Sequence, residues 1–510
     1  MNMKRTAPFF AALFAGSLLA GAAIDNSALM PPYKPDAEAV MEKDAEGGET
    51  PDWIKSLIIV ELRIHSASTD GTVKGLLPAL DHLAEMGVNG VWLTPPINGG
   101  NGYGNFGIHT LSPLLTGEKN PVKQWQVLRN FVDEAHKRNI RVFFDVVNWG
   151  ATKHEGGSRL LKEKPEWFGE YFAPYAGWFF NWENRELNEW FSSRLVEWFL
   201  MTGVDGFRCD CAPNYSGFGP FETAKKRMRS FGRKVVFMAE WTSSGKNVFD
   251  LDQLTFCFTD AKGKRRTHWV GDVYLKKNIV DMVRSGEELR AWDDMEREPG
   301  TKRFYTYMLS CHDSDHYIVK GSPITIGYQA IFAPFIPLWY VGEEWDNAPR
   351  FFVDYFYRRD KHPVPKKWRL YGNVIDWAQK EENRDFFELV KKMIRIRRQH
   401  PEIFEYFPGS HRDSNICKVA TDRPGLLQAY ARFRNGRAVL IVPNNTEKAE
   451  RFRITIPFRE AELAAGKTYR VTDLLEDRTA AEVRNTWHYH TEKACSGTYT
   501  YSGKDVCRCD

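Results

Sequence analysis

The chain has 510 residues, of which 43% are hydrophobic and 27% charged, an ordinary balance for a folded protein with a large core. Its formal net charge is only +4 and no long basic run occurs, so we expect no nucleic-acid partner. This length suits one barrel-sized domain of about 250 residues, with insertions, together with an accessory domain.

The N-terminus has the pattern of a secretory signal peptide. Lys4 and Arg5 precede an apolar stretch over residues 7–20, and small residues follow up to Ala23. The apolar stretch is shorter than the roughly 20 residues that a membrane-spanning helix needs. We therefore expect a signal peptide over residues 1–23, then a leader or linker over 24–51, and a secreted or periplasmic protein without stable membrane insertion.

From residue 52 to about residue 400, short apolar runs alternate with stripes of helical spacing, which indicates parallel strands joined by crossover helices. The number of strand candidates favours a closed barrel. The predicted fold class is therefore α/β: a (β/α)8 TIM barrel over 52–400, with a short aromatic-rich insertion over 149–183 after strand 3. The strands are expected at 57–64, 90–93, 140–147, 204–208, 235–239, 254–258, 304–309 and 336–340, and the clearest helices at 73–84, 125–135, 187–198 and 385–399.

The pattern changes after Pro401. Apolar and polar residues alternate on both sides of Asn435-Gly436, a strong signal for a β-hairpin. This predicts a C-terminal antiparallel β-sandwich domain over 401–480. Residues 481–510 form a tail with Cys and His residues, in which one disulfide among Cys495, Cys507 and Cys509 would fit an oxidising compartment.

Three carboxylates, Asp210, Glu240 and Asp313, each stand at the end of a strand-like run. The C-terminal ends of parallel barrel strands meet at one mouth, where catalytic groups lie. Two carboxylates at close range are the nucleophile and the acid/base of a retaining glycosidase. The set therefore indicates sugar chemistry, and the high aromatic content suits stacking against sugar rings. The ordinary alternative for each residue is an ion pair at the barrel rim.

These carboxylates lie in segments that resemble motifs of the α-amylase family of retaining glycoside hydrolases, whose catalytic domain is a (β/α)8 barrel. The resemblance runs from about Leu57 to about residue 480 and rests on several motifs in the family's order. In this chain they are Gly87–Pro95, Gly206–Asp210, Ala239-Glu240, His312-Asp313 and Ile336–Glu344.

The resemblance implies a role for each site residue. Asp210 would be the nucleophile, and Arg208, two residues earlier on the same strand face, would hold it and lower its pKa. Glu240 would act as general acid and then as base. Asp313 would bind ring hydroxyls and distort the sugar, and His312 would donate a hydrogen bond to the same sugar.

A second group of residues follows from the same resemblance. Tyr103 lies in a segment of the length that the family has after strand 2, where an early Tyr stacks under the sugar. Asp145 begins the third-strand motif, Asp-x-x-x-Asn-His in the family, and is expected to support the site by pairing with Arg208. The Asn and His of that motif are Trp149 and Gly150 here, so the resemblance does not support the structural calcium that the Asn helps to hold.

Cysteines flank the predicted site, and the residue before His312 is Cys311 where relatives have Asn. Cys209, Cys211 and Cys311 could bind a metal, but buried free thiols in barrel strands are the expected reading. We therefore predict no metal site and no cofactor.

The expected function is a secreted glycoside hydrolase that cleaves α-glucosidic bonds in α-glucans or malto-oligosaccharides by a retaining double displacement. Two alternatives remain open. The same covalent intermediate would serve an α-glucan transglycosylase. The altered third-strand motif would also suit a non-catalytic glucan-binding protein on a degenerate barrel, although Asp210, Glu240 and Asp313 are all present.

Overall fold

The predicted signal peptide and residues 24–49 of the predicted leader lie outside the part of the chain that the structure describes. Within that part, no helix combines the length and the apolar character needed to cross a bilayer. The computed structural model describes residues 50–98, 103, 110–153, 155–212, 219–240, 248–253, 256–259, 265–268, 304–313, 325–347, 351–353, 361–363, 374–405, 415–423, 429–443, 451–484, 498–502 and 505–509.

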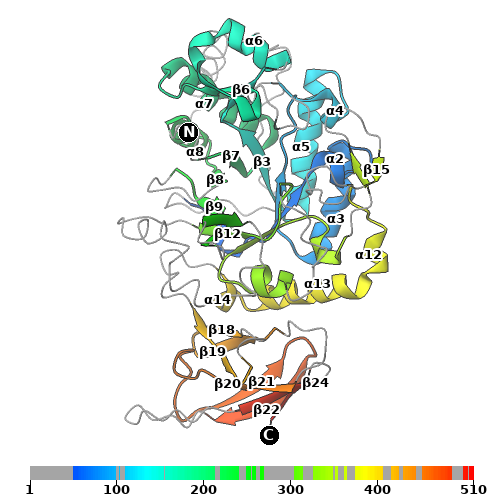
Figure 1. The fold of residues 1–510 in the computed structure, drawn as a ribbon, viewed down its shortest axis with the longest axis vertical. Coiled ribbons are helices and arrows are strands. Elements are labelled where there is room, and N and C mark those ends of the chain that lie inside the picture. The colour runs from blue at the N-terminus through cyan, green and yellow to red at the C-terminus, as the bar shows by residue number, and fades with distance from the viewer. Residues whose placement is uncertain are drawn as a thin grey trace, which may run out of the picture.

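The larger domain is a closed barrel of parallel strands, as predicted (Figure 1). Around the barrel the strand order is β1-β13-β12-β9-β8-β7-β3-β2, so sequential strands are neighbours and the last closes on the first. The strands are β1 (Ile59–Leu62), β2 (Gly90–Leu93), β3 (Arg141–Val147), β7 (Gly206–Asp210), β8 (Val236–Ala239), β9 (Leu251–Gln253), β12 (Phe304–Met308) and β13 (Ile336–Tyr340).

The sixth barrel strand lies elsewhere than the sequence predicts. The expected run, 254–258, is apolar, whereas the barrel strand is β9, three residues earlier. Residues Phe256–Thr259 instead form β10, which pairs with β11 (Arg265–His268) in a separate hairpin. The pattern misled because β9 carries Asp252 and Gln253, which are polar but fully buried in the barrel.

Several of the longer helices begin or end at residues with a clear local cause. In α5 and α7 the N-cap side chains, Asn120 and Asn184, accept backbone N–H bonds of the first turn. Gly87 ends α3 in the left-handed conformation, at φ +84°. These helices are α3 (Leu77–Met86), α5 (Pro121–Lys137), α7 (Arg185–Thr202), α8 (Gly219–Arg229) and α13 (Arg384–Gln399); shorter ones are α2 (Ile64–Ala67), α4 (Pro113–Thr116), α6 (Glu155–Glu163), α12 (Gln379–Glu382) and α14 (Pro401–Phe404).

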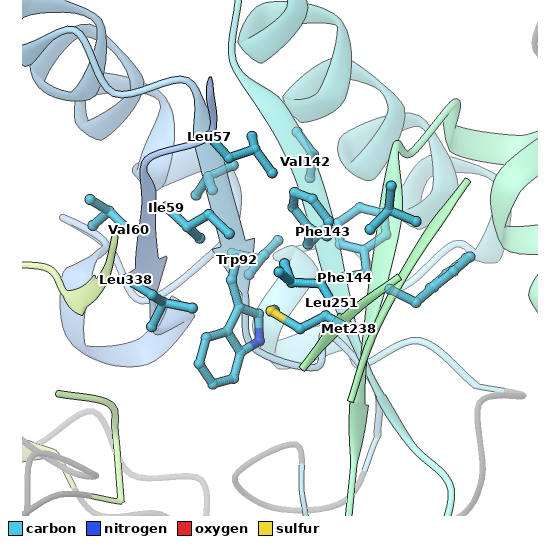
Figure 2. Close-up of a cluster of buried hydrophobic side chains, with 14 of the residues drawn as sticks. Leu57, Ile59, Val60, Trp92, Val142, Phe143, Phe144, Met238, Leu251 and Leu338 are labelled. Carbon is cyan, nitrogen blue, oxygen red and sulfur yellow. The ribbon is translucent and has the colours of Figure 1, made fainter. Parts of the chain in front are cut away.

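The barrel core is formed by apolar side chains from most of the strands (Figure 2). Trp92 on β2 is fully buried and lies where this core meets a layer of polar side chains. Its indole N–H bonds the carboxylate of Asp145 in that layer. The labelled core side chains are Leu57, Ile59, Val60, Trp92, Val142, Phe143, Phe144, Met238, Leu251 and Leu338.

The aromatic insertion after β3 folds into a small antiparallel sheet with the order β4-β6-β5, accompanied by α6. Its strands are β4 (Gly150–Thr152), β5 (Phe168–Phe172) and β6 (Gly177–Phe180). Because β4 starts three residues after β3 ends, this sheet stands directly at the carboxyl end of the barrel, beside the predicted site.

The C-terminal region is built of antiparallel sheets, as predicted, and lies below α13 and α14 in Figure 1. Asn435 and Gly436 form the expected hairpin turn, both with positive φ. Two strands from the predicted tail, β23 and β24, extend the sheet that contains β20. The strands are β16 (Ile416–Lys418), β17 (Ala420–Thr421), β18 (Tyr430–Arg434), β19 (Arg437–Ile441), β20 (Arg451–Thr455), β21 (Thr468–Asp473), β22 (Arg478–Arg484), β23 (Thr498–Ser502) and β24 (Asp505–Cys509); a further hairpin pairs β14 (Phe351–Val353) with β15 (Lys361–Pro363).

A buried arginine joins the β domain to the barrel. Arg432 on β18 is 1% exposed, and its Nη1 donates to the carbonyl oxygens of Phe332 (3.1 Å) and Ala333 (2.9 Å). Its Nη2 donates to the carbonyl oxygen of Ile403 at 3.0 Å. One side chain of β18 thus bonds carbonyl groups of the segment before β13 and of α14.

We expect Arg432→Met to lower the free energy of unfolding by on the order of 3 kcal/mol, because it removes a donor from each of several buried carbonyl groups. Arg437→Met is the matched control. Arg437 lies on the same hairpin, but its side chain is exposed and its Nη1 bonds the side chain of Glu402. Its effect should stay within about 0.5 kcal/mol. Denaturant unfolding measures both, and equal losses would contradict the role assigned to Arg432.

Candidate functional site

A single guanidinium, that of Arg208, organises the polar layer at the carboxyl end of the barrel. Its Nη1 donates to Asp145 Oδ2 at 3.0 Å and to Asp210 Oδ1 at 2.8 Å, and its Nη2 lies 2.8 Å from Glu240 Oε1. Arg208 and Asp210 share one face of β7, and Asp145 stands opposite Arg208 in the register of β3 and β7. The pairings of Arg208 with Asp210 and with Asp145 are as predicted.

Asp145 is held by two further donors. Trp92 Nε1 donates to its Oδ2 at 3.0 Å, and the Tyr103 hydroxyl donates to the same oxygen at 2.6 Å. Arg208 also lies over the Trp92 ring, 4.7 Å from its centroid. Burial raises the pKa of Asp145 to about 6, although Arg208 and Tyr103 favour its ionised form. Asp145 therefore supports the cluster from beneath.

Asp210 and Glu240 form a close pair of buried carboxylates. Oxygen atoms of the two side chains lie within 4.8 Å of each other. Asp210 ends β7 and Glu240 directly follows β8, so neighbouring strands present them to the same space. The backbone N–H of Cys211 donates to Glu240 Oε2, and Cys211 adopts a left-handed conformation, φ +55°, to do so.

The charge state of Asp210 differs from the prediction. Arg208 does favour the carboxylate, but burial and the neighbouring charge of Glu240 outweigh it and raise the pKa of Asp210 well above its usual range. The sequence places the arginine correctly, whereas the extent of burial depends on how the insertion and the barrel close around the pair.

His312 and Asp313 follow β12 at the edge of this cluster. The His312 ring is buried, stacked on Tyr103 at 4.6 Å between centroids and bonded through Nδ1 to Glu61. Its Nε2 lies 3.5 Å from Asp313 Oδ2. The Asp313 side chain is 44% exposed, so it faces the open side of the site rather than the buried layer.

Comparison with known proteins finds similar sequences and similar structures. The sequence model described as "Alpha amylase, catalytic domain" matches residues 43–178. Over 465 residues, 82% of this chain and 74% of the relative, the chain is 22% identical to Alpha-amylase 2 of Dictyoglomus thermophilum. It is 20% identical to Neopullulanase 2 of Thermoactinomyces vulgaris over 77% of this chain and 66% of that protein.

These matches support a relationship of the chain to the alpha-amylase family of glycoside hydrolases. Its fold is similar to two solved structures. One is the maltogenic alpha-amylase AmyB from Thermotoga neapolitana, with a TM-score of 0.60, 18% identity and coverage of 89% of this chain and 98% of that one. The other is the Geobacillus thermoleovorans alpha-amylase complexed with acarbose, with a TM-score of 0.61, 17% identity and the same coverage.

The departures from the alpha-amylase family's third-strand motif have a structural reason. Gly150 lies in β4 opposite Phe179, and a Cβ at Gly150 would stand 1.9 Å from the carbonyl oxygen of Trp178. No side chain fits there. Trp149 is buried against Tyr175 and Phe179, with centroids 5.0 and 6.1 Å away. It offers no oxygen, so this position does not fit a calcium ligand.

Three residues at the site were not assigned from the sequence. Glu61 and Trp92 lie in apolar strand runs, where nothing in the pattern marks them as polar partners of the site. Tyr175, considered only as one of many insertion aromatics, is 41% exposed. Burial, followed by the interactions with Cys211, Asp210 and Glu240, raises the pKa of its hydroxyl. Cys209, Cys211 and Cys311 are buried and form no disulfide.

The raised pKa of Asp210 has a consequence for stability. Because the folded protein binds this proton more tightly than the unfolded chain does, the contribution of Asp210 to stability falls as the pH rises from about 4 through its folded-state pKa. Asn cannot ionise, and Arg208 keeps Asp145 and Glu240 as partners. Asp210→Asn should therefore be more stable than the wild type at pH 8, by about 1 kcal/mol, and the gain should shrink toward pH 4.

Thermal unfolding between pH 4 and pH 8 measures this difference. Asp385→Asn, at an exposed position in the first turn of α13, serves as the control and should show no gain that grows with pH. A stabilisation by Asp210→Asn that is largest at pH 4 would contradict the assigned direction.

The packing of Gly150 gives a second prediction. Restoring the family's residue with Gly150→His should lower stability by more than 2 kcal/mol and reduce activity, because the side chain displaces β6 from β4. Gly169→Ala in β5 is the control, since its Cβ would meet only an ordinary contact at 3.9 Å. Thermal unfolding of both variants tests this, and a Gly150→His enzyme as stable as the control would refute the clash.

Proposed function

We propose that this protein hydrolyses α-glucosidic bonds in α-glucans or malto-oligosaccharides with retention of anomeric configuration. The observation that carries the proposal is the separation of the Asp210 and Glu240 oxygens, within 4.8 Å. Retaining glycosidases hold their two carboxyl groups about 5–5.5 Å apart, whereas inverting enzymes need about 6.5–9.5 Å to admit a water. The close pair supports a double displacement.

In the first step, Asp210 attacks the anomeric carbon. Arg208 holds Oδ1 of Asp210, so we assign the attack to Oδ2. The bond between the anomeric carbon and the leaving oxygen breaks, and Glu240 transfers its proton to that oxygen. Asp210 must be ionised for this step. Arg208 favours that form, and a protonated Glu240, as general acid, no longer contributes the neighbouring charge that opposes it.

In the second step, Glu240, now a carboxylate, removes a proton from a water molecule. The water oxygen bonds to the anomeric carbon as the bond to Asp210 breaks, which restores both side chains. The Cys211 N–H and Arg208 both contact Glu240 and so stabilise its carboxylate between the two steps.

Recognition of the sugar is assigned to groups around this pair. Asp313 and His312 lie together at the open side and suit sugar hydroxyls, and the Tyr103 ring is fixed by its stacking on His312. Tyr171 and Tyr175 on the insertion are exposed aromatic rings, 45% and 41%, which suit stacking against further glucose units. The names of the relatives, alpha-amylases and a neopullulanase, agree with an α-glucan substrate.

We also propose that the enzyme acts outside the cytoplasm. This rests on the sequence alone, on Lys4, Arg5 and the apolar residues 7–20, all outside the described residues. Sequencing the N-terminus of the protein purified from culture medium or periplasm would test it, with cleavage expected after Ala23.

We expect the wild type to release sugars from a panel of α-glucans and malto-oligosaccharides, and Asp210→Ala and Glu240→Gln to lower kcat/KM at least a thousandfold. Removing the nucleophile or the acid raises the barrier to the glycosyl transfer itself. Glu189→Gln, an exposed glutamate bonded to Arg227, is the matched control and should keep full activity.

The anomeric configuration of the first product, followed by proton NMR, decides the stereochemistry: retention yields the α-anomer before mutarotation. A β-anomer would overturn the double displacement. Transfer products that dominate when a sugar acceptor is added would identify a transglycosylase instead. Glucan binding without turnover by the wild type would point to a non-catalytic binding protein.

A further inference from the structure

A buried glutamate that has no part in the two-step mechanism contacts His312 at two points. Glu61, on β1, is fully buried. Its Oε2 accepts the backbone N–H of His312 at 3.1 Å, and its Oε1 lies 2.5 Å from the ring Nδ1. Backbone and ring of His312 are thereby both fixed to one carboxyl group, 251 residues earlier in the sequence.

A proton, rather than a metal ion, joins this pair. The Cys311 thiol is close enough to Glu61 and His312 to complete a group of possible metal ligands. Ligands at about 2.0–2.1 Å from a tetrahedral zinc ion, however, lie roughly 3.3 Å from each other. The O–N separation of 2.5 Å is that of a short hydrogen bond.

The position of the proton follows from burial and charge. Burial raises the pKa of Glu61 well above its usual range, and burial together with Arg63 and Arg208 lowers the pKa of His312. Burial disfavours the charged form of both groups, and the Asp313 carboxylate, 3.5 Å from Nε2, favours a hydrogen on that nitrogen. Because Oε2 accepts the backbone N–H, the acid proton belongs on Oε1, which donates to Nδ1. A neutral ring that accepts at Nδ1 carries its own hydrogen on Nε2.

The ring has no freedom to turn away from this arrangement. Tyr103 stacks on it at 4.6 Å with an interplanar angle of 20°, and Trp92 meets it edge-on at 5.8 Å and 70°. Nε2 faces the half-exposed Asp313, at 3.5 Å from Oδ2. The N–H thus points to the side of the site that is open to substrate.

We propose that Glu61 is a positioning residue which, as a neutral acid, holds His312 in the tautomer that presents Nε2–H to a sugar hydroxyl beside Asp313. The sugar in this statement rests on the proposed function, whereas the tautomer does not.

Two substitutions of Glu61 separate the neutral acid from the carboxylate. In Glu61→Gln the amide oxygen can accept the backbone N–H and the amide nitrogen can donate to Nδ1, so the pattern of the neutral acid is kept. We expect kcat/KM of this variant within about threefold of the wild type. Glu61→Leu removes both bonds and should lower kcat/KM about 10- to 100-fold, as loss of a supporting partner typically does. A loss in Glu61→Gln as large as in Glu61→Leu would overturn the proposal.

A double-mutant cycle tests whether Glu61 acts through His312. Glu61→Leu combined with His312→Ala should be no less active than His312→Ala alone, whereas additive losses would contradict the inference. Glu344→Gln is the control, because Glu344 is equally buried and bonds His82, at 2.7 Å, on the outer helix α3. It should change stability but not kcat/KM, and thermal unfolding of every variant separates misfolding from loss of function.

The tautomer can be observed without any substrate. In full-length protein labelled with ¹⁵N-histidine, and with the His312 signals assigned from the His312→Ala spectrum, we expect the hydrogen on Nε2 in the wild type and in Glu61→Gln. A hydrogen on Nδ1 would overturn the proposal. If the wild type cleaved no glucan, the proposed function would fail while this measurement still decided the role of Glu61.

Discussion

The site depends on one buried cation that serves three carboxylates. Arg208 bonds Asp145, Asp210 and Glu240, so the layer carries more negative than positive charge in a space from which water is largely excluded. A buried ion pair seldom adds stability, because desolvation offsets the attraction. Arg208 holds the three carboxylates close together, and burial with the excess negative charge raises the pKa of Asp145 and of Asp210.

Neutral hydrogen-bond donors add to the bonds that Arg208 makes in this layer. Trp92 and Tyr103 both donate to Asp145, and in our proposal Glu61 enters the layer as an uncharged acid bonded to His312. A further carboxylate at Glu61 would meet the field of Asp145, which already raises its pKa. The carboxylates next to the apolar core of Figure 2 therefore each have a hydrogen-bond donor. Trp92 belongs both to the polar layer and to the apolar core.

The sequence was a good guide wherever apolar runs and fixed spacings decide the structure. The barrel strands follow apolar runs, and the pairing of Arg208 with Asp210 follows from two residues on one strand. The sequence did not reveal β9, because Asp252 and Gln253 are polar but face a polar interior. It did not mark Glu61 as a site residue either, because a single acid in the run of β1 forms no pattern. The pKa of Asp210 was misjudged because burial is set by contacts between distant segments, which local sequence does not contain.

The altered third-strand motif is best understood as one change rather than two. Strand β6 approaches so closely that only glycine fits at Gly150, and Trp149 fills the space between β3 and the insertion. A histidine on this strand cannot coexist with that packing. Tyr175, in the turn before β6, packs on Trp149 from the insertion side. In our proposal Tyr175 contacts the sugar from the insertion instead of a barrel strand. Because a turn tolerates change more readily than a barrel strand, the insertion is where differences in substrate preference could arise at least cost to the fold.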